Sequence, residues 1–144
     1  MSYVRIWVHL VFATKFREPW LTKNILKIVR SHIIENCKEK DIFLQKINGH
    51  VDHMHCLVSL GKQQSISEVA QLIKGESSYW INKNKLLTDY FNWQDDYYAV
   101  SVSESQVDKV SNYINRQEQH HKNKTFQQEE EDFILKFGFE RLKD

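Results

Sequence analysis

One short segment, Val51–Leu60, constrains the fold more than any other, because it combines a buried strand with two histidines. Successive strand side chains point to opposite faces, so His53 and His55 share one face. The apolar residues of the segment fall on the other face: Met54, Cys56, Val58 and Leu60. The apolar face requires a helix packed against it, whereas the two imidazoles can hold one cation between them.

The histidine pair has two interpretations that this segment alone leaves open. A single strand histidine commonly fills space with its ring hydrogen-bonded, and this is the plainer interpretation of His9. Two histidines on one face of a rigid strand favour a metal site, because ordering both ligands costs little entropy. A metal site would need further ligands from elsewhere in the chain.

Composition sets outer limits on the function. The 144 residues suffice for one domain with a sizeable core. No apolar run reaches membrane-spanning length and no signal-peptide pattern is present, so we expect a cytoplasmic protein with no membrane partner. Cys37 and Cys56 lack metal-ligand spacing and are predicted to be reduced core residues. Because the net charge is only +1, a nucleic-acid surface has to be local, and the first half carries the candidates: Arg5, Lys15, Arg17, Lys23, Lys27 and Arg30.

Strands and helices are predicted in an order that indicates a fold class. Strands are expected at Val4–Thr14, Ile42–Asn48, Val51–Leu60 and within Phe91–Ser103, with Asn48-Gly49 as a turn signal. Helices are expected at Thr22–Lys40 and from a cap at Ser65 or Ser67 to about Lys83, with Glu68 placed for a capping box with Ser65. This order indicates an α+β, ferredoxin-like split βαβ fold, in which an antiparallel sheet carries both helices on one face. We expect the first and third strands to be central, and the second face to stay open and to carry four aromatic side chains: Trp7, His9, His53 and His55.

One helix more than this core requires is predicted at about 105–122, opened by Ser105 and Asp108. Its apolar stripe consists of Val107, Val110 and Ile114. Along one edge of the stripe, spacings of three and four residues bring together Tyr113, Gln117 and either His120 or His121. Without further context, the plainer interpretation of Tyr113 is a packing residue at the margin of the core.

A final helix is predicted at about 125–138, where Thr125 and Gln128 form a capping box. The acidic run Glu129–Asp132 falls in its first turns, which the helix dipole favours, and is interpreted as a solvent-exposed face. Together with a core at about 3–103, these helices complete a single domain of residues 1–144.

Four segments in order carry a resemblance to a known family. They are Trp7–Trp20 with the motif His-Leu-Val-Phe-Ala-Thr-Lys-Phe-Arg, Asp52–Leu60 with its histidine pair, Trp93–Ser103, and Asn112–Gln128 with a tyrosine four residues before a glutamine. Together they resemble the HUH tyrosine transposases of small insertion sequences, over nearly the whole chain.

The resemblance implies cleavage and rejoining of single-stranded DNA through a 5′-phosphotyrosine. It implies Tyr113 as the nucleophile and His53, His55 and Gln117 as ligands of Mg²⁺ or Mn²⁺. It further implies a homodimer, in which the tyrosine helix can serve either chain, and recognition of DNA hairpins near the ends of the element. Some relatives place an acidic ligand just before the histidine pair, where this chain has His50 and Asp52, and either could fill that role.

Four further residues are candidate DNA contacts: His9, Lys15, Arg17 and Arg116. Two other functions fit the same fold. A ferredoxin-like sheet can bind single-stranded RNA or DNA on its open face, which would explain Trp7 and His9 but not the histidine pair. A metal-dependent hydrolytic nuclease would use the histidines and leave Tyr113 as a packing residue. The hairpin and the cleavage sequence are not encoded in any pattern of the chain.

Overall fold

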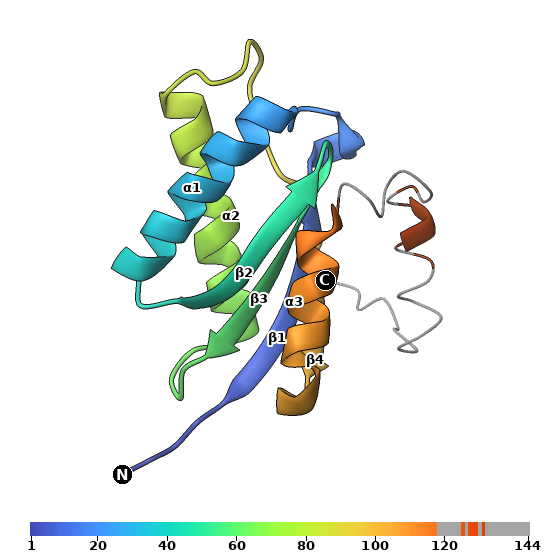
Figure 1. Ribbon diagram of the computed structural model, residues 1–144. Coiled ribbons are helices and arrows are strands. Elements are labelled where there is room, and N and C mark those ends of the chain that lie inside the picture. The colour runs from blue at the N-terminus through green and yellow to red at the C-terminus, as the bar shows by residue number, and fades with distance from the viewer. Residues whose placement is uncertain (118–124, 126, 130, 132–144) are drawn as a thin grey trace.

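The computed structural model describes residues 1–117, 125, 127–129 and 131, and shows an α+β fold (Figure 1). Its main elements in chain order are β1 (Ile6–Ala13), α1 (Lys23–Glu39), β2 (Phe43–His50), β3 (His53–Leu60), α2 (Ile66–Lys83), β4 (Tyr98–Val102) and α3 (Val107–Asn115). Two short 3₁₀ turns, Lys15–Arg17 and Glu104–Gln106, precede α1 and α3. Among these residues, no helix has the length and apolar character needed to span a membrane.

The four strands form one antiparallel sheet in the order β2-β3-β1-β4, as the ferredoxin-like prediction requires. β3 and β1 are the central pair, which confirms the prediction for the first and third strands. Their register sets Leu10 opposite Cys56 and Val11 opposite His55. Residues 8, 10 and 12 of β1 therefore share one face of the sheet with residues 54, 56 and 58 of β3, and residues 7, 9 and 11 share the other face with His53 and His55.

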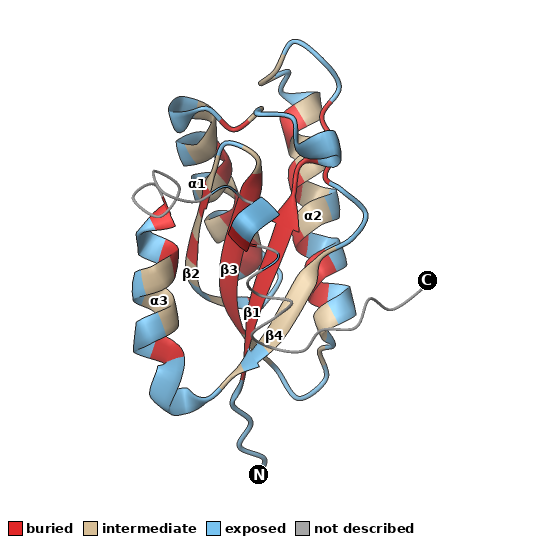
Figure 2. Cartoon of the chain, turned by 90° about the vertical axis from the view of Figure 1, so that its right-hand side faces the viewer, coloured by how far each residue is buried: buried red, intermediate tan, exposed pale blue. Residues whose placement is uncertain are grey.

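The apolar face of the sheet, defined by Val8, Leu10, Phe12, Met54, Cys56 and Val58, packs against α1 and α2 (Figure 1). From α1, Val29, Ile33 and Cys37 enter this core, since their spacing places them on one side of the helix. Both cysteines are buried and unbridged, as predicted. Figure 2 shows that β1 and β3 are buried over most of their length.

The second face of the sheet, called here the histidine face, carries Trp7, His9, His53 and His55, as predicted. The prediction that this face is open is wrong, because these four side chains are buried. α3 lies across it and packs Val107 and Ile114 against Trp7 and Leu57 (Figure 1). The reason lies in α3 itself, since its apolar stripe has to be buried somewhere and the sheet of its own chain provides the surface. These two residues of the stripe therefore pack on the sheet of their own chain.

The turn between β2 and β3 falls at Val51 and Asp52, and the prediction of a turn at Asn48-Gly49 is wrong. Asn48 and Gly49 lie in β2, opposite His55 and Met54. A side chain at Gly49 would come within 2.3 Å of the His53 carbonyl oxygen, so glycine is needed here for close packing of two strands.

The predicted ends of the later helices and of the fourth strand can be compared with the structure. α2 begins after Ser65, whose hydroxyl accepts a hydrogen bond from the Glu68 amide at 3.1 Å, as the capping box predicted. The fourth strand, Tyr98–Val102, lies within the expected segment Phe91–Ser103, and the aromatic residues before it pack into the core from a loop. α3 spans Val107–Asn115, and the Arg116 amide after it donates to the carbonyl oxygens of Asn112 and Tyr113. Positions 118–122 of the predicted helix lie outside the described residues.

Part of the predicted C-terminal helix falls on described residues. Thr125 and Gln128 form the reciprocal capping box, with donor–acceptor distances of 3.0 and 3.2 Å. Residues 126, 130 and 132–138 of this predicted helix lie outside the described residues, as do His120 and His121 of the helix predicted at about 105–122.

Candidate active site

His53 and His55 face the same side of β3 and are completely buried, with ring centroids 5.1 Å apart. The alternation of the strand places both rings on the histidine face, as the sequence predicted. The Nε2 atoms of both rings lie near one carboxylate: His53 Nε2 is 3.4 Å from Oε2 of Glu129, and His55 Nε2 is 3.1 Å from Oε1. The two histidines thus converge on a shared point.

Two further oxygen ligands reach this point from the C-terminal side of the chain. Gln117 is fully buried just beyond α3, and its Oε1 lies 3.2 Å from His53 Nε2. Glu129 is 1% exposed, and one ligand atom from each of His53, His55 and Glu129 fits within 4.8 Å. Two imidazole nitrogens, a carboxylate and an amide oxygen form a donor set that suits a borderline or hard divalent cation.

Each histidine is oriented through its other ring nitrogen. Asp52 Oδ1 accepts from His53 Nδ1 at 2.8 Å, and His9 Nε2 lies 2.9 Å from His55 Nδ1. When each Nδ1 carries the proton, both Nε2 lone pairs point toward Glu129 and Gln117. Proteins commonly fix metal-binding histidines in this way. Asp52 therefore lies behind His53, while His50 is a ring neighbour of His53 at 6.5 Å between centroids.

The pKa values of His53 and His9 are shifted in opposite directions. Burial opposes a charge on His53, but the hydrogen bonds and negative charges of Asp52 and Glu129 outweigh it and raise the pKa of His53. Burial and the neighbouring His55 together lower the pKa of His9 to about 3, so His9 is neutral at physiological pH. A positive charge is therefore favoured on His53, between Asp52 and Glu129, and disfavoured on His9 behind His55.

Tyr113 lies at the edge of this cluster, on α3 of the same chain. Its hydroxyl donates a hydrogen bond to Glu129 Oε1, and its ring centroid is 5.7 Å from that of His55. The ring also meets His9 edge-on at 6.1 Å. Because α3 lies across the histidine face, the predicted pairing of Tyr113 with Gln117 along one helix edge brings both to the histidines.

The prediction that Glu129 belongs to a solvent-exposed acidic face is wrong. Glu129 contacts both histidines and the tyrosine, and it is buried. Local periodicity could not identify it, because an acidic residue in a first helical turn is normally explained by the helix dipole. The one usable signal was the Thr125–Gln128 capping box, which fixes where that turn begins.

Residues 2–117 match the family model described as "Transposase IS200 like". The chain belongs to this family. The matched residues include the histidine pair, Tyr113 and Gln117, whereas Glu129 lies beyond their end.

Relatives and solved structures agree with this assignment. The transposase for insertion sequence element IS200 of Salmonella typhimurium is 27% identical over 114 residues, covering 76% of this chain and 74% of that protein. The corresponding transposase of Salmonella typhi gives the same values. The fold resembles a crystal structure of a transposase candidate from Deinococcus radiodurans R1, with a TM-score of 0.65, 22% identity and coverage of 81% and 95% of the two chains. It also resembles a REP-associated tyrosine transposase bound to a REP hairpin, with a TM-score of 0.60, 18% identity and coverage of 84% and 72%.

The candidate DNA contacts of this IS200-like transposase occupy different environments. Lys15 and Arg17 are exposed in the 3₁₀ turn after β1, where the Thr14 amide bonds the Asp52 carbonyl at 2.8 Å, so the turn adjoins the site. Arg116 is exposed directly beside Gln117. His9 is buried and reaches the site through His55 instead of facing solvent.

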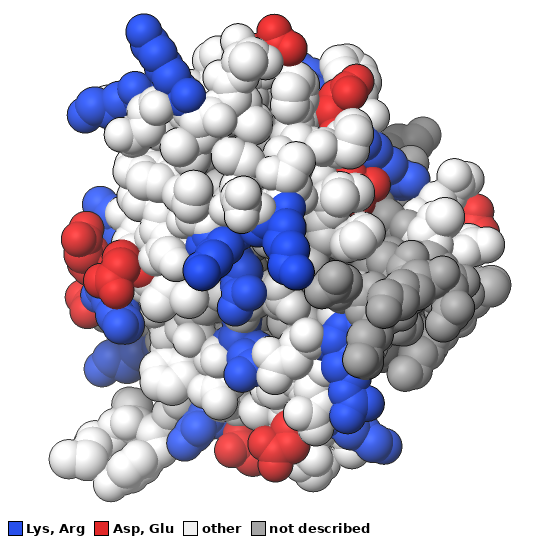
Figure 3. Space-filling view, turned by 45° about the horizontal axis from the view of Figure 1, so that its top comes forward, with Lys and Arg blue, Asp and Glu red and all other residues white. Residues whose placement is uncertain are grey.

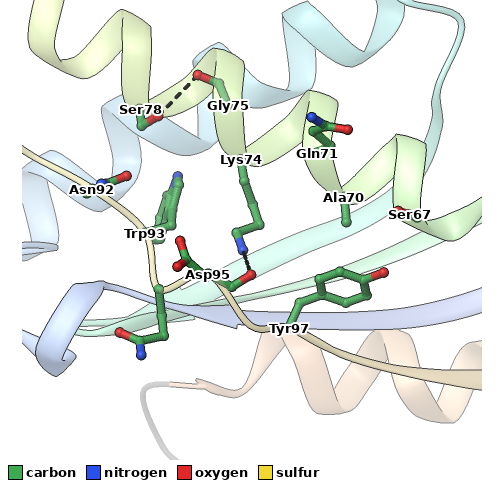
Figure 4. Close-up of a pocket in the computed structure, with 11 residues that line it drawn as sticks. Ser67, Ala70, Gln71, Lys74, Gly75, Ser78, Asn92, Trp93, Asp95 and Tyr97 are labelled. Carbon is green, nitrogen blue, oxygen red and sulfur yellow. Dashed lines mark hydrogen bonds between the residues drawn. The ribbon is translucent and has the colours of Figure 1, made fainter. Parts of the chain in front are cut away.

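A separate hollow of about 280 Å³ lies between α2 and the loop before β4 (Figure 4). Its lysine, Lys74, donates to the carbonyl oxygens of Asp95 and Asp96 at 2.8 and 3.3 Å. Its ammonium also lies 5.8 Å from the centre of the Tyr97 ring. Lys74 thus ties the loop to the helix of this transposase, and the hollow contains none of the residues of the histidine–tyrosine cluster.

Proposed function

We propose that the protein cleaves and rejoins single-stranded DNA through a covalent 5′-phosphotyrosine on Tyr113, with a divalent cation held by His53, His55, Gln117 and Glu129. One observation carries the proposal: the phenol of Tyr113 and the Nε2 atoms of both histidines meet at the same buried carboxylate. A packing tyrosine would not need this arrangement, whereas a nucleophile beside a cation site does.

The proposed reaction exchanges one phosphate ester for another and so keeps the energy of the bond that it breaks. The Tyr113 oxygen attacks the scissile phosphorus, a bond forms between them, and the bond from phosphorus to the 3′ oxygen breaks. The leaving 3′ oxygen takes up one proton, which balances the proton lost by the phenol, and becomes a 3′-hydroxyl. Phenol titrates near pH ~10, so it needs an acceptor for its proton, and Glu129 is placed to receive it. A 3′-hydroxyl from another strand can reverse the step and seal a new joint, which requires no external energy source.

Mg²⁺ or Mn²⁺ fits the donor set, since Glu129 and Gln117 supply oxygens and two neutral imidazoles suit the softer of the two ions. When bound, such a cation neutralises charge on the phosphate and polarises one of its oxygens. The hydrogen bonds from Asp52 and His9 would hold the two histidines in the tautomer that binds it.

The DNA substrate and the assembly state are proposed on the family resemblance. We propose hairpins at the ends of the element as the recognised DNA, consistent with the REP hairpin on the similar solved structure. A homodimer acting in the cytoplasm, with residues 1–144 as one domain, completes the proposal. Light scattering at micromolar concentration tests the dimer, and a strictly monomeric protein would argue against it.

The deciding experiment uses Tyr113→Phe with a labelled oligonucleotide that carries a hairpin and a single-stranded flank. Wild-type protein with Mn²⁺ should form a labelled adduct on a denaturing gel, and Tyr113→Phe should form none while binding the hairpin unchanged. Tyr79→Phe is the matched control, because Tyr79 is 63% exposed on α2 and should retain the adduct. An adduct from Tyr113→Phe would place the nucleophile elsewhere, and cleavage that leaves free 5′-phosphate ends would indicate a hydrolytic nuclease.

A further inference from the structure

A groove of about 520 Å³ lies between α1 and the turn that joins β2 to β3. One wall carries Lys23, Lys27 and Arg30 from α1, and the opposite wall carries residues 48–51 and Asn115. None of the described residues that line it is acidic. Figure 3 shows Lys and Arg side chains gathered near the middle of one face of the molecule.

The three cations of the groove form a stripe that follows from helical spacing. Residues separated by three or four positions lie above one another on a helix, so Lys23, Lys27 and Arg30 line up. At a rise of 1.5 Å per residue, the stripe extends for about 10 Å along α1. Such a row matches a linear series of negative charges better than a single anion.

These cations are not used by the fold. Within the described part of the chain, none of the three forms an ion pair with an acidic side chain. Arg30 is half-buried, and its Nε atom is buried with no hydrogen-bond partner among the described residues. Burying part of a cation without a partner costs free energy, which an anionic ligand in the groove would recover.

The opposite wall leads to the candidate active site. His50 lines the groove, and its ring lies 6.5 Å from that of His53. Asn48 donates to the Asn115 carbonyl oxygen at 3.2 Å, which joins the strand to the tyrosine helix at the groove. Gly49 lies between Asn48 and His50 on this same wall of the groove.

We infer that this groove binds the sugar–phosphate backbone of the single-stranded DNA segment that enters or leaves the active site. The inference rests on the proposed function for the identity of the DNA and deepens it by assigning the path. Proteins that bind single strands without sequence preference combine a positively charged groove along the backbone with aromatic side chains that stack bases, and this groove supplies the charged part. Its walls carry no Trp, Tyr or Phe among the described residues, so it holds phosphates and does not stack bases.

The test measures binding with two charge-removing variants of equal size. Lys27→Gln/Arg30→Gln removes two groove cations, and Lys38→Gln/Lys40→Gln removes two exposed cations from the other end of α1. The probes are a labelled twelve-nucleotide oligothymidine and a hairpin with and without a single-stranded tail, at several salt concentrations with EDTA. Thermal melting checks that both variants remain folded.

The groove variant should bind oligothymidine and the tailed hairpin roughly tenfold more weakly, and its log–log salt slope should fall by about 1.4, since each single-strand phosphate contact contributes roughly 0.7. The control variant and the tail-less hairpin should change less than about twofold. Unchanged binding by the groove variant, equal loss in the control variant, or equal loss with the tail-less hairpin would each overturn the inference. Because no catalysis is measured, these outcomes are independent of whether Tyr113 forms an adduct.

Discussion

The two faces of the sheet are built by the same strands and are buried to the same degree, yet different interactions stabilise them. Met54 and Cys56 on the apolar face are fully buried, and so are His53 and His55 on the histidine face. The apolar face is stabilised by close packing against two long helices. On the histidine face, every described imidazole has a polar neighbour: a carboxylate, an amide or another imidazole.

We therefore expect substitutions on the two faces of one strand to have different effects, on stability at one face and on function at the other. The cost of changing the apolar face should appear in the free energy of unfolding, because packed volume is lost there. The cost of changing the histidine face should appear in cation binding and catalysis, because its groups are oriented for a ligand.

The largest effect is expected from His55→Ala. Removing one of the two imidazole ligands should lower cleavage of a hairpin oligonucleotide by about 10³-fold or more, because the stabilisation that a cation gives is worth several kcal/mol. The folded state should remain, as judged by circular dichroism. Replacement of His32, which pairs with Glu76 between α1 and α2, is the control and should leave cleavage unchanged. Near-normal cleavage by His55→Ala would show that His55 is not needed as a cation ligand.

Phe12→Ala is the counterpart on the apolar face. Phe12 is 1% exposed and packs edge-on against Trp93 at 4.7 Å between ring centroids. Its truncation should lower the free energy of unfolding by about 3–5 kcal/mol, measured by urea denaturation. Ile6→Ala, at the half-exposed start of the same strand, should cost clearly less. Equal costs at the two positions would mean that the apolar face is not the main source of stability.

Asp52→Asn tests the support behind His53. The asparagine can still accept the hydrogen bond from Nδ1 but lacks the charge, so affinity for Mn²⁺ should fall about 10–100-fold in calorimetry. Asp89→Asn, in an exposed loop, should bind Mn²⁺ normally. If Asp52→Asn also binds Mn²⁺ normally, the charge of Asp52 does not affect the metal affinity of His53.

The smallest effect concerns His9 and pH. Its pKa is about 3 in the folded protein but near 6.5 when unfolded, so the unfolded chain takes up a proton that the folded protein does not. Below pH 6.5 the wild type should therefore lose up to about 1.4 kcal/mol of stability per pH unit relative to His9→Gln. Urea denaturation in EDTA at pH 7.5, 6 and 5 measures this difference, and parallel curves for the two proteins would contradict the buried neutral His9.

The ferredoxin-like sheet and the histidine pair were predictable because both depend on local periodicity. Alternation in Val51–Leu60 places His53 and His55 on one face whatever packs on that face. Helical spacing likewise predicted that Tyr113 and Gln117 share an edge, and both lie at the histidines.

What could not be predicted depends on contacts between distant parts of the chain. Nothing in the pattern of Glu129 distinguishes a buried ligand from a solvated acid, because the difference is made by residues of β3. The covering of the histidine face by α3 is also a tertiary effect, since an amphipathic helix can pack on its own chain or on a partner. At Gly49, a residue usually associated with turns serves close strand packing instead.

The buried Glu129, in the turn that the Thr125 capping box begins, would let the proposed cation affect stability as well as chemistry. His53 and Glu129 are 76 residues apart, and closing a loop of that length costs about 4 kcal/mol of chain entropy. A cation bound jointly from β3 and from Glu129 would act as a reversible cross-link and offset this cost by mass action, by about 2.7 kcal/mol when its concentration is 100 times its dissociation constant. The supply of free divalent cation would then set how firmly the Glu129 carboxylate is held against the sheet, so the same ion would govern both the proposed chemistry and the assembly of the site.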